Sequence, residues 1–402
     1  MRFSQGSGRE LGLFDAALTR FPDWDGRYAP SGDADLRQAI YAPESTYADA
    51  AALAIAALFQ AEADPLMARR LAESSFSAEP PRRAVGEDIL VLDLADGPSA
   101  SAADQSAAFL AAVAAQEARR GQRVTLLADG SGSEGAALSE AVAGARGVDL
   151  ALLYPEGAEA SGIRLARLSR EGGNTLLIGT SADSDGVGAM IRSLAGASFD
   201  DRVVAAAGRG NPARFASRLV GLTAAFALLR SGTAGEIYIG LRAGDSLDLA
   251  SGLWTWRLGI PITGFIVPRL RSEPTGGRRR DDRWRDDRWR DPAGDEIVDG
   301  FAREMPGAIR SLVLPIDVEA EAVESARGFM DRDSAAILAA AQKALADGLR
   351  GHARIVVPRL AHPYWDGDAA PPASLASGLL DARKDGSVGS RPAELLEFLK
   401  RH

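Results

Sequence analysis

A short run of glycine, serine and acidic residues lies between a predicted strand and a predicted helix, at Asp129-Gly130-Ser131-Gly132-Ser133-Glu134-Gly135. A Gly/Ser loop that opens a helix presents backbone N–H groups at the positive end of the helix dipole, which makes it a ready site for an anion. The carboxylate of Glu134 places a negative charge in the mouth of this loop, which counts against anion binding. A plain tight turn before a Ser/Glu-capped helix is the alternative interpretation.

A second candidate site follows the predicted strand at 202–207, where Asn211 precedes a proline and Arg214 comes shortly after it. The planar fork of an arginine guanidinium suits a phosphate group well. An asparagine N-cap with proline at the first helical position explains half of this pattern without any ligand. The ligand-binding candidates of the two loops are Ser131, Gly132, Ser133, Gly135, Asn211 and Arg214.

A third loop, Gly244-Asp245-Ser246-Leu247-Asp248, also stands directly before a predicted helix. Its two aspartates would repel an anion such as a phosphate. The simpler interpretation of this loop is the start of a helix that is capped by an aspartate.

Primary amines are rare in this chain. Of its 46 basic residues only Lys343, Lys384 and Lys400 are lysines, and the others are arginines. A covalent bond to a carbonyl compound needs an amine that can lose its proton, which arginine cannot supply. The chain has no cysteine, and His362 has no carboxylate at ligand spacing, so the sequence predicts neither a thiolate nucleophile nor a metal site.

The composition is that of a globular protein, with 402 residues, 46% hydrophobic residues and a formal net charge of −9 at pH 7. The negative charge counts against a surface that binds nucleic acid. Apolar runs of the length that a signal peptide or a membrane span needs are missing. The sequence therefore predicts a soluble, cytoplasmic protein without nucleic-acid or membrane partners.

Short apolar runs alternate with helical stretches from about residue 86 onward. Runs such as Val148–Tyr154 are apolar almost throughout, which is typical of parallel strands covered on both faces. The alternation predicts an α/β protein with helices on both sides of its sheets. The predicted strands are 89–94, 123–128, 148–154, 174–178, 202–207, 236–240, 263–267, 311–315 and 354–358. The predicted helices are 104–120, 134–145, 185–194, 213–230, 247–258 and 334–347.

Two regions depart from this alternation. Residues 1–85 are expected to form a mostly helical N-terminal domain, with a helix at 47–62, and residues 86–402 a two-lobed α/β region. Residues 271–296 are dominated by Arg and Asp and have no apolar face beyond two tryptophans. This composition predicts a mobile, solvated insertion, with a partner-docking segment as the alternative.

Several motifs together resemble the threonine synthases, which carry pyridoxal phosphate (PLP) as a Schiff base on the lysine of a His-Gly-Pro-Thr-x-x-Phe-Lys-Asp motif. The similar segment here runs from Asp96 to Asp104, with Asp96 in place of the family's His and Ala103 in place of its Lys. Further similar segments follow the family's order: Asp25–Pro30, Gly147–Gly157, Leu258–Pro261 and Ala361–Pro363. The resemblance covers nearly the whole chain. It implies the fold type II PLP architecture, similar to tryptophan synthase β, with two parallel-sheet α/β subdomains behind a mostly helical N-terminal domain.

The resemblance also implies roles for the three loops. Asp129–Gly135 is similar to the family's loop around the acidic groups of the substrate, with Glu134 in place of a threonine. Gly210–Arg214 is similar to a segment that faces the substrate phosphate. The former cofactor-phosphate loop consists of Gly244, Asp245, Ser246, Leu247 and Asp248, and Leu360 replaces the threonine that faces the pyridine nitrogen.

Ala103, Leu247 and Leu360 replace the amine, part of the phosphate cradle and the ring-nitrogen partner that PLP catalysis needs. We therefore predict a threonine synthase-like protein that is catalytically inactive, has no catalytic residue and no cofactor, and is retained for binding or assembly. One alternative is a PLP-dependent lyase that converts O-phosphohomoserine to threonine with displaced catalytic groups. Another is a module that binds an amino acid or an anion in the old substrate cleft. The expected partners are a small amino acid or anion and a second copy of the chain in a homodimer.

Overall fold

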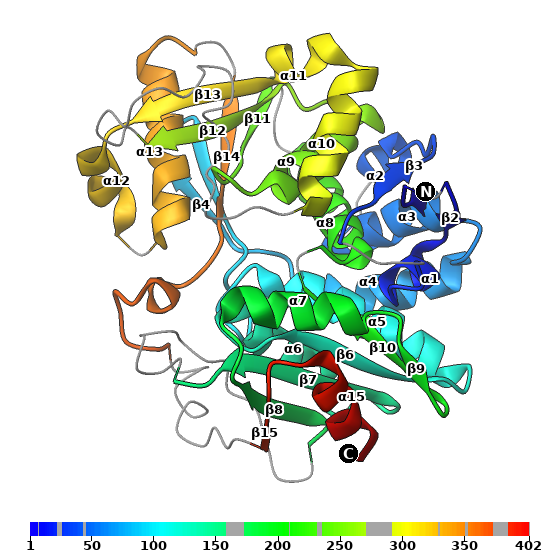
Figure 1. Ribbon diagram of the computed structural model, residues 1–402. Coiled ribbons are helices and arrows are strands. Elements are labelled where there is room, and N and C mark those ends of the chain that lie inside the picture. Colours follow the sequence, from blue (N-terminus) through cyan, green and yellow to red (C-terminus); the bar gives the residue numbers. More distant parts are fainter. Residues whose placement is uncertain are drawn as a thin grey trace. The chain divides into compact units, whose positions relative to one another are not determined.

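The computed structural model describes residues 1–6, 8–21, 26–42, 46–157, 173–208, 210–230, 235–270, 292–328, 330–349, 353–372 and 385–401. Contacts divide the chain into two units, and each is built around a six-stranded sheet (Figure 1). Unit 1 contains Met1–Ser31, Gly97–Ser217 and Pro371–His402, and unit 2 contains Gly32–Asp96 and Arg218–Ala370. Each unit therefore combines segments that are distant in the sequence.

The sheet of unit 1 has the strand order β15-β8-β7-β6-β10-β9, and its neighbours are parallel except β9 and β10. Its strands are β6 (Arg123–Asp129), β7 (Val148–Pro155), β8 (Thr175–Thr180), β9 (Ser198–Phe199), β10 (Arg202–Ala206) and β15 (Gly386–Val388). The side chains of β7 and β10 are almost all buried, which explains the near-continuous apolar sequences of these strands.

Helices and a small second sheet complete unit 1. α7 (Ser184–Leu194) and α15 (Pro392–Arg401) share an apolar core with the central strands of the sheet. α5 (Ala103–Arg119) and α6 (Ser133–Val142) pack against each other and against β6 and β7. The N-terminal segment forms the sheet β2-β1-β3 and a short helix: β1 (Arg2–Ser4), β2 (Glu10–Leu11), α1 (Leu13–Ala17) and β3 (Ala29–Ser31).

The sheet of unit 2 has the order β13-β12-β11-β14-β5-β4, and only β4 runs antiparallel to its neighbour. Its strands are β4 (Arg82–Val85), β5 (Ile89–Asp93), β11 (Ile237–Gly240), β12 (Gly264–Leu270), β13 (Val313–Val318) and β14 (Arg354–Arg359). Its helices are α2 (Arg37–Tyr41), α3 (Tyr47–Phe59), α4 (Pro65–Ser75), α9 (Ser246–Arg257), α10 (Pro292–Glu304), α11 (Pro306–Leu312), α12 (Ala320–Arg327), α13 (Arg332–Ala346) and the 3-10 helix η3 (Pro363–Asp366). α8 (Pro212–Arg230) begins in unit 1 and ends in unit 2.

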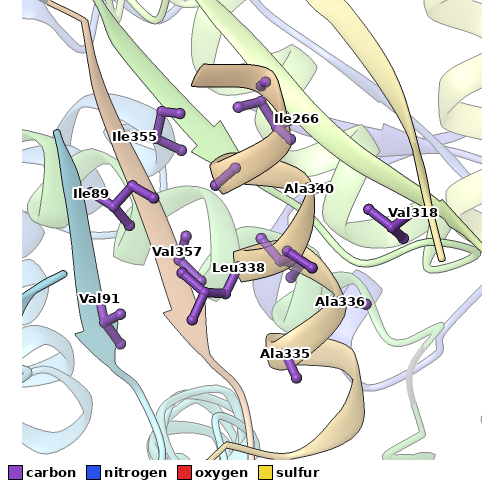
Figure 2. Close-up of a cluster of buried hydrophobic side chains, with 14 of the residues drawn as sticks. Ile89, Val91, Ile266, Val318, Ala335, Ala336, Leu338, Ala340, Ile355 and Val357 are labelled. Atoms are coloured by element: carbon purple, nitrogen blue, oxygen red, sulfur yellow. The ribbon is translucent and has the colours of Figure 1, made fainter. Parts of the chain in front are cut away.

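The core of unit 2 lies between α13 and the sheet. Figure 2 shows the side chains that meet there: Ile89 and Val91 from β5, Ile355 and Val357 from β14, Ile266 from β12, and Ala335, Ala336, Leu338 and Ala340 from α13. The small alanine side chains let the helix lie close to the strands, where β-branched residues fill the space between them. Asp331 caps the helix by accepting a hydrogen bond from the N–H of Ser334 (3.1 Å).

Neighbouring parallel strands end at the same edge of each sheet. In unit 1 the loops after β6 and β10 leave this edge side by side, because the two strands are hydrogen-bonded neighbours. In unit 2 the loops after β11 and β14 do the same. Open α/β sheets bind their ligands at such carboxyl edges, and the three candidate loops and Leu360 all follow strands at these positions.

The predicted α/β class is confirmed, and the alternating strands and helices lie close to their predicted positions. Residues 1–85 contain helices but also the strands β1 to β4, and the boundary at residue 85 stays a prediction. Residues 271–291 of the predicted insertion lie outside the described residues, whereas residues 292–296 form the start of α10. Within the described residues, no helix has both the length and the apolar character that a membrane span requires.

Candidate functional site

Ala103 is the first residue of α5 and takes part in a chain of hydrogen bonds in unit 1. Its N–H donates to Ser101 Oγ (3.1 Å), and Ser101 Oγ donates in turn to Ser133 Oγ (3.0 Å). On its other side, Ser106 Oγ donates to the carbonyl oxygen of Ala103 (3.0 Å), and Arg214 Nη1 donates to Ser106 Oγ (3.4 Å). The fold therefore brings Ala103 together with the predicted candidates Ser133 and Arg214.

The loop after β6 is held by hydrogen bonds within itself. Asp129 Oδ1 accepts hydrogen bonds from the N–H (2.8 Å) and the Oγ (2.7 Å) of Ser131. Gly132 is the N-cap of α6 and has a φ of 80°, a left-handed conformation that favours glycine, and Gly135 is buried in the first turn. Sequence reasoning missed the role of Asp129, although an aspartate two residues before its partner is a common turn signal.

Arg214 is the most deeply buried of the predicted ligand-binding side chains, with only 1% of its surface exposed. Its Nε donates to the carbonyl oxygen of Ala207 (3.0 Å), and its Nη1 lies 3.6 Å from Glu134 Oε1. The arginine that was predicted to face an anion therefore has a carboxylate of its own chain beside it.

Asn211 has a structural role at the start of α8. Its Nδ2 donates to the carbonyl oxygens of Ala17 (2.6 Å) and Ala206 (2.6 Å), and its Oδ1 accepts from the N–H of Ala213 (2.9 Å). These bonds tie the N-terminal segment to the end of β10 and cap the helix, as the interpretation without a ligand predicts. A ligand-binding role for Asn211 stays a prediction.

The loop Gly244–Asp248 contains an aspartate cap, and in unit 2 it forms a network of charges. Asp245 accepts hydrogen bonds from the N–H groups of Leu247 (3.1 Å) and Asp248 (3.1 Å), at the first turn of α9. Two arginines, Arg218 and Arg242, pair with the two aspartates, and we call these four residues the α9 charge cluster. The distances are 2.5 Å for Arg242 Nη2–Asp245 Oδ2, 2.7 Å for Arg218 Nη1–Asp248 Oδ1, 2.9 Å for Arg242 Nε–Asp248 Oδ2 and 3.2 Å for Arg218 Nη1–Asp245 Oδ1.

Burial alone would lower the pKa of Arg242, but the carboxylates of Asp245 and Asp248 raise it well above its ordinary value. Sequence reasoning identified both aspartates and missed both arginines. Arg242 lies three residues before Asp245, a spacing that could have suggested the pair.

The loop Gly244–Asp248, as folded at the start of α9, does not fit a phosphate group. Two of the N–H groups that would hold a phosphate already donate to the Asp245 carboxylate, which is 5% exposed. α10 also approaches this turn closely, because a Cβ built on Gly294 would lie 2.4 Å from the backbone nitrogen of Leu247. Leu247 and Ser246 are buried beneath this contact.

Leu360 follows β14 and belongs to the hydrophobic packing of unit 2. Its side chain packs against the core between α13 and the sheet, and its N–H donates to Ser334 Oγ (2.8 Å). Nearby, His362 Nδ1 accepts a hydrogen bond from the N–H of Tyr364 (3.1 Å). Across the described parts of the chain, no group of three or more His, Asp or Glu side chains could hold a metal ion.

Asp104 is a partly buried carboxylate in the first turn of α5. It accepts hydrogen bonds from the N–H of Ser99 (3.3 and 3.2 Å), and it leaves so little room that a Cβ on Gly97 would lie 2.2 Å from its Oδ2. Burial raises the pKa of Asp104 to about 6, although the hydrogen bonds from Ser99 act in the opposite direction.

This raised pKa predicts a stability that falls as pH increases from about 4 to about 6. In that window the folded protein keeps the Asp104 proton that the unfolded chain, with a pKa of 3.8, has lost. We compare the free energy of unfolding of the wild type with that of Asp104→Asn. We expect the wild-type value minus the variant value to be about 1–3 kcal/mol larger at pH 4.5 than at pH 7.5. Urea unfolding at the two pH values measures this difference. Asp201→Asn, which changes an exposed carboxylate of the same unit, is the control, and an equal pH effect in both variants would contradict the prediction.

Comparisons with known proteins place these features in a family context. No protein-family model matches the chain. The threonine synthase of Serratia marcescens is 25% identical over 269 residues, which cover 65% of this chain and 58% of that protein. The threonine synthase of Escherichia coli is 26% identical over 217 residues, which cover 52% of this chain and 49% of that protein. The chain thus spans about half the length of the curated relatives it matches.

Solved threonine synthases have the same fold. The crystal structure from Escherichia coli gives a TM-score of 0.76 at 18% identity and covers 100% of both chains. The PLP-bound structure from Brucella melitensis gives a TM-score of 0.73 at 17% identity and covers 100% of this chain and 99% of the other. At these identities the similarity shows the architecture.

The prediction that this protein has no cofactor is wrong. Its homologues are threonine synthases, and the Brucella melitensis structure contains PLP, so PLP is the cofactor that the family implies. The loop Gly244–Asp248 as folded does not fit the phosphate of PLP. The predicted family is confirmed: the chain is a distant homologue of the threonine synthases and has the fold type II architecture of PLP-dependent enzymes.

Proposed function

We propose that this chain is a threonine synthase-like protein that does not form threonine and is retained for binding or assembly. The observation that carries the proposal is the identity of the first residue of α5. Ala103 stands there, in the segment Asp96–Asp104 that resembles the threonine synthase motif with the Schiff-base lysine. An alanine methyl group can neither form a covalent bond to a carbonyl carbon nor move a proton.

The lysines that the structure describes do not offer a replacement. Lys343 lies on the surface of α13 and pairs with Asp347 (3.3 Å), and its side chain is 46% exposed. Lys400 lies on the last helix and pairs with Glu397 (2.8 Å), and its side chain is 41% exposed. Lys384 lies outside the described residues. Arginines such as Arg214 keep their protons and cannot act as the missing amine.

Two other loops of the chain support the same proposal. By the resemblance, one of these loops would hold the acidic groups of a substrate, and it carries Glu134. The other would hold the cofactor phosphate, and it carries Asp245 and Asp248, the two carboxylates of the α9 charge cluster. These changes affect different parts of one catalytic machinery, in which the contributions of individual groups are strongly non-additive.

The test is an assay of purified protein with O-phosphohomoserine and added PLP, in which threonine and released phosphate are measured. The threonine synthase of Escherichia coli serves as the positive control. We expect a rate at least about 10⁴-fold below that control, because the group that acts covalently is missing. We also expect Ala103→Lys to remain inactive, because the α9 charge cluster, Glu134 and Leu360 are unchanged in it. Threonine formation by the wild type would contradict the proposal, and rapid turnover by Ala103→Lys would show that the rest of the site is intact.

The proposed binding and assembly roles have their own measurements. Binding of a small amino acid stabilises the folded protein in proportion to ligand concentration and affinity, so it is measured as a rise in melting temperature. Assembly into a homodimer is measured as a doubled mass in light scattering. If the protein were a monomer and no amino acid raised its melting temperature, neither role would be supported.

A further inference from the structure

The loop Asp129–Gly135 uses its own acidic side chains where an anionic ligand would be held. Asp129 accepts both hydrogen bonds that the Ser131 side chain and backbone can donate, at 2.7 and 2.8 Å. Ser133 Oγ, at the first position of α6, accepts a hydrogen bond from Ser101 Oγ (3.0 Å). The serines of the loop therefore have partners within unit 1, on both sides of Gly132.

Glu134 adds a full negative charge at the same place. It lies in the first turn of α6, where the helix dipole favours an anion, and its Oε1 is 3.6 Å from Nη1 of Arg214. The side chain of Arg214 is 1% exposed, whereas that of Glu134 is 23% exposed. A guanidinium buried this deeply needs a negative charge nearby, and Glu134 provides it from the more exposed side.

We propose that Glu134 is a specificity-determining residue that replaces the phosphate of a phosphorylated ligand. It supplies the charge that Arg214 and the start of α6 would otherwise take from a phosphate, and it repels a second anion. The loop then selects for ligands that carry no phosphate at this end, such as an unphosphorylated amino acid. This inference names the ligand class for the binding role proposed above and rests on that role, but its test measures phosphate binding and needs no turnover.

The size of the effect follows from the charge and the distance. Two unit charges less than 4 Å apart interact strongly enough, even with the screening of bulk water, to change an equilibrium constant several-fold, and more where protein reduces the screening. A phosphate near Arg214 would lie at a comparable distance from Glu134 and would meet this repulsion. Removal of the Glu134 charge is therefore expected to lower the dissociation constant for phosphate at least about tenfold.

The experiment compares Glu134→Gln with the wild type by titration calorimetry and by thermal unfolding. Inorganic phosphate is the probe, and potassium chloride keeps the ionic strength equal. Glu140→Gln makes the same charge change on an exposed residue of α6 and is the matched control. We expect Glu134→Gln to bind phosphate at least about tenfold more tightly than the wild type, and its melting temperature to rise with phosphate. We expect no such gain in Glu140→Gln.

Two outcomes would overturn the inference. One is phosphate binding by the wild type that equals the binding by Glu134→Gln, and the other is a Glu134→Gln protein that gains no phosphate binding. If Glu134→Gln fails to fold because Arg214 loses its carboxylate, the wild type supplies the second test, because its melting temperature should not rise with phosphate at constant ionic strength. Threonine formation by the wild type would contradict the proposed function without changing the phosphate titration, so the two failures are distinguishable.

Discussion

Asp245→Ala is expected to lower the free energy of unfolding by about 3–5 kcal/mol, the largest loss among the polar substitutions considered. Asp245 is 5% exposed, pairs with Arg218 and Arg242, and accepts hydrogen bonds from two N–H groups of α9. Its removal leaves two largely buried guanidinium groups with fewer negative partners and uncaps the helix, and a lost cap alone costs about 1 kcal/mol. Urea unfolding measures the loss.

Two comparison variants separate charge, cap and surface effects. Asp245→Asn keeps an oxygen for the cap and removes only the charge, so its loss should be smaller. Asp347→Ala breaks the exposed pair with Lys343 (3.3 Å), and such pairs contribute at most about 1 kcal/mol. If Asp245→Ala cost no more than Asp347→Ala, the α9 charge cluster would contribute no more than a surface ion pair.

Ile337→Ala is expected to cost about 2–5 kcal/mol, because it empties part of the core between α13 and the sheet. Ile337 is 0% exposed and belongs to the buried hydrophobic cluster between α13 and the sheet. It also fills the space above Gly240, where a Cβ would lie 2.1 Å from Ile337 Cγ2. Gly240 is the last residue of β11 and leads into the loop of the α9 charge cluster, so this contact helps to position that loop.

A double-mutant cycle tests the contact directly. Gly240→Ala alone should destabilise the protein by about 1–3 kcal/mol through overpacking. In the Ile337→Ala background the added methyl group enters the space that the isoleucine has left, so Gly240→Ala should cost less there than in the wild type. Additive losses in the double variant would mean that the two residues do not compete for the same space. Gly307→Ala, on α11 with no atom within 4 Å of a built Cβ, is the control for a methyl group that meets no neighbour.

The strands that sequence patterns predicted well are those buried on both faces. Val148–Pro155 is apolar almost throughout, because β7 lies inside the sheet of unit 1 with neighbours on both sides. β4 was not predicted, because Arg82–Val85 is a charged and mostly exposed edge strand with little apolar signal. The small sheet of β1, β2 and β3 was missed for a related reason: its strands are only two or three residues long, and tertiary contacts decide such pairings.

In the candidate site, too, some features follow from the sequence and others from the tertiary structure. The sequence by itself determined which chemical groups are present: alanine at position 103, carboxylates at Glu134, Asp245 and Asp248, and no lysine before Lys343. Only the tertiary structure decided their partners, because strand order determines which loops meet at a sheet edge. Arg214 reaches Glu134 because β10 pairs with β6, so that the start of α8 lies beside the start of α6. Spacing along the chain does not show which distant residues become neighbours. Charge pairing between such residues depends on where the folded backbone places them.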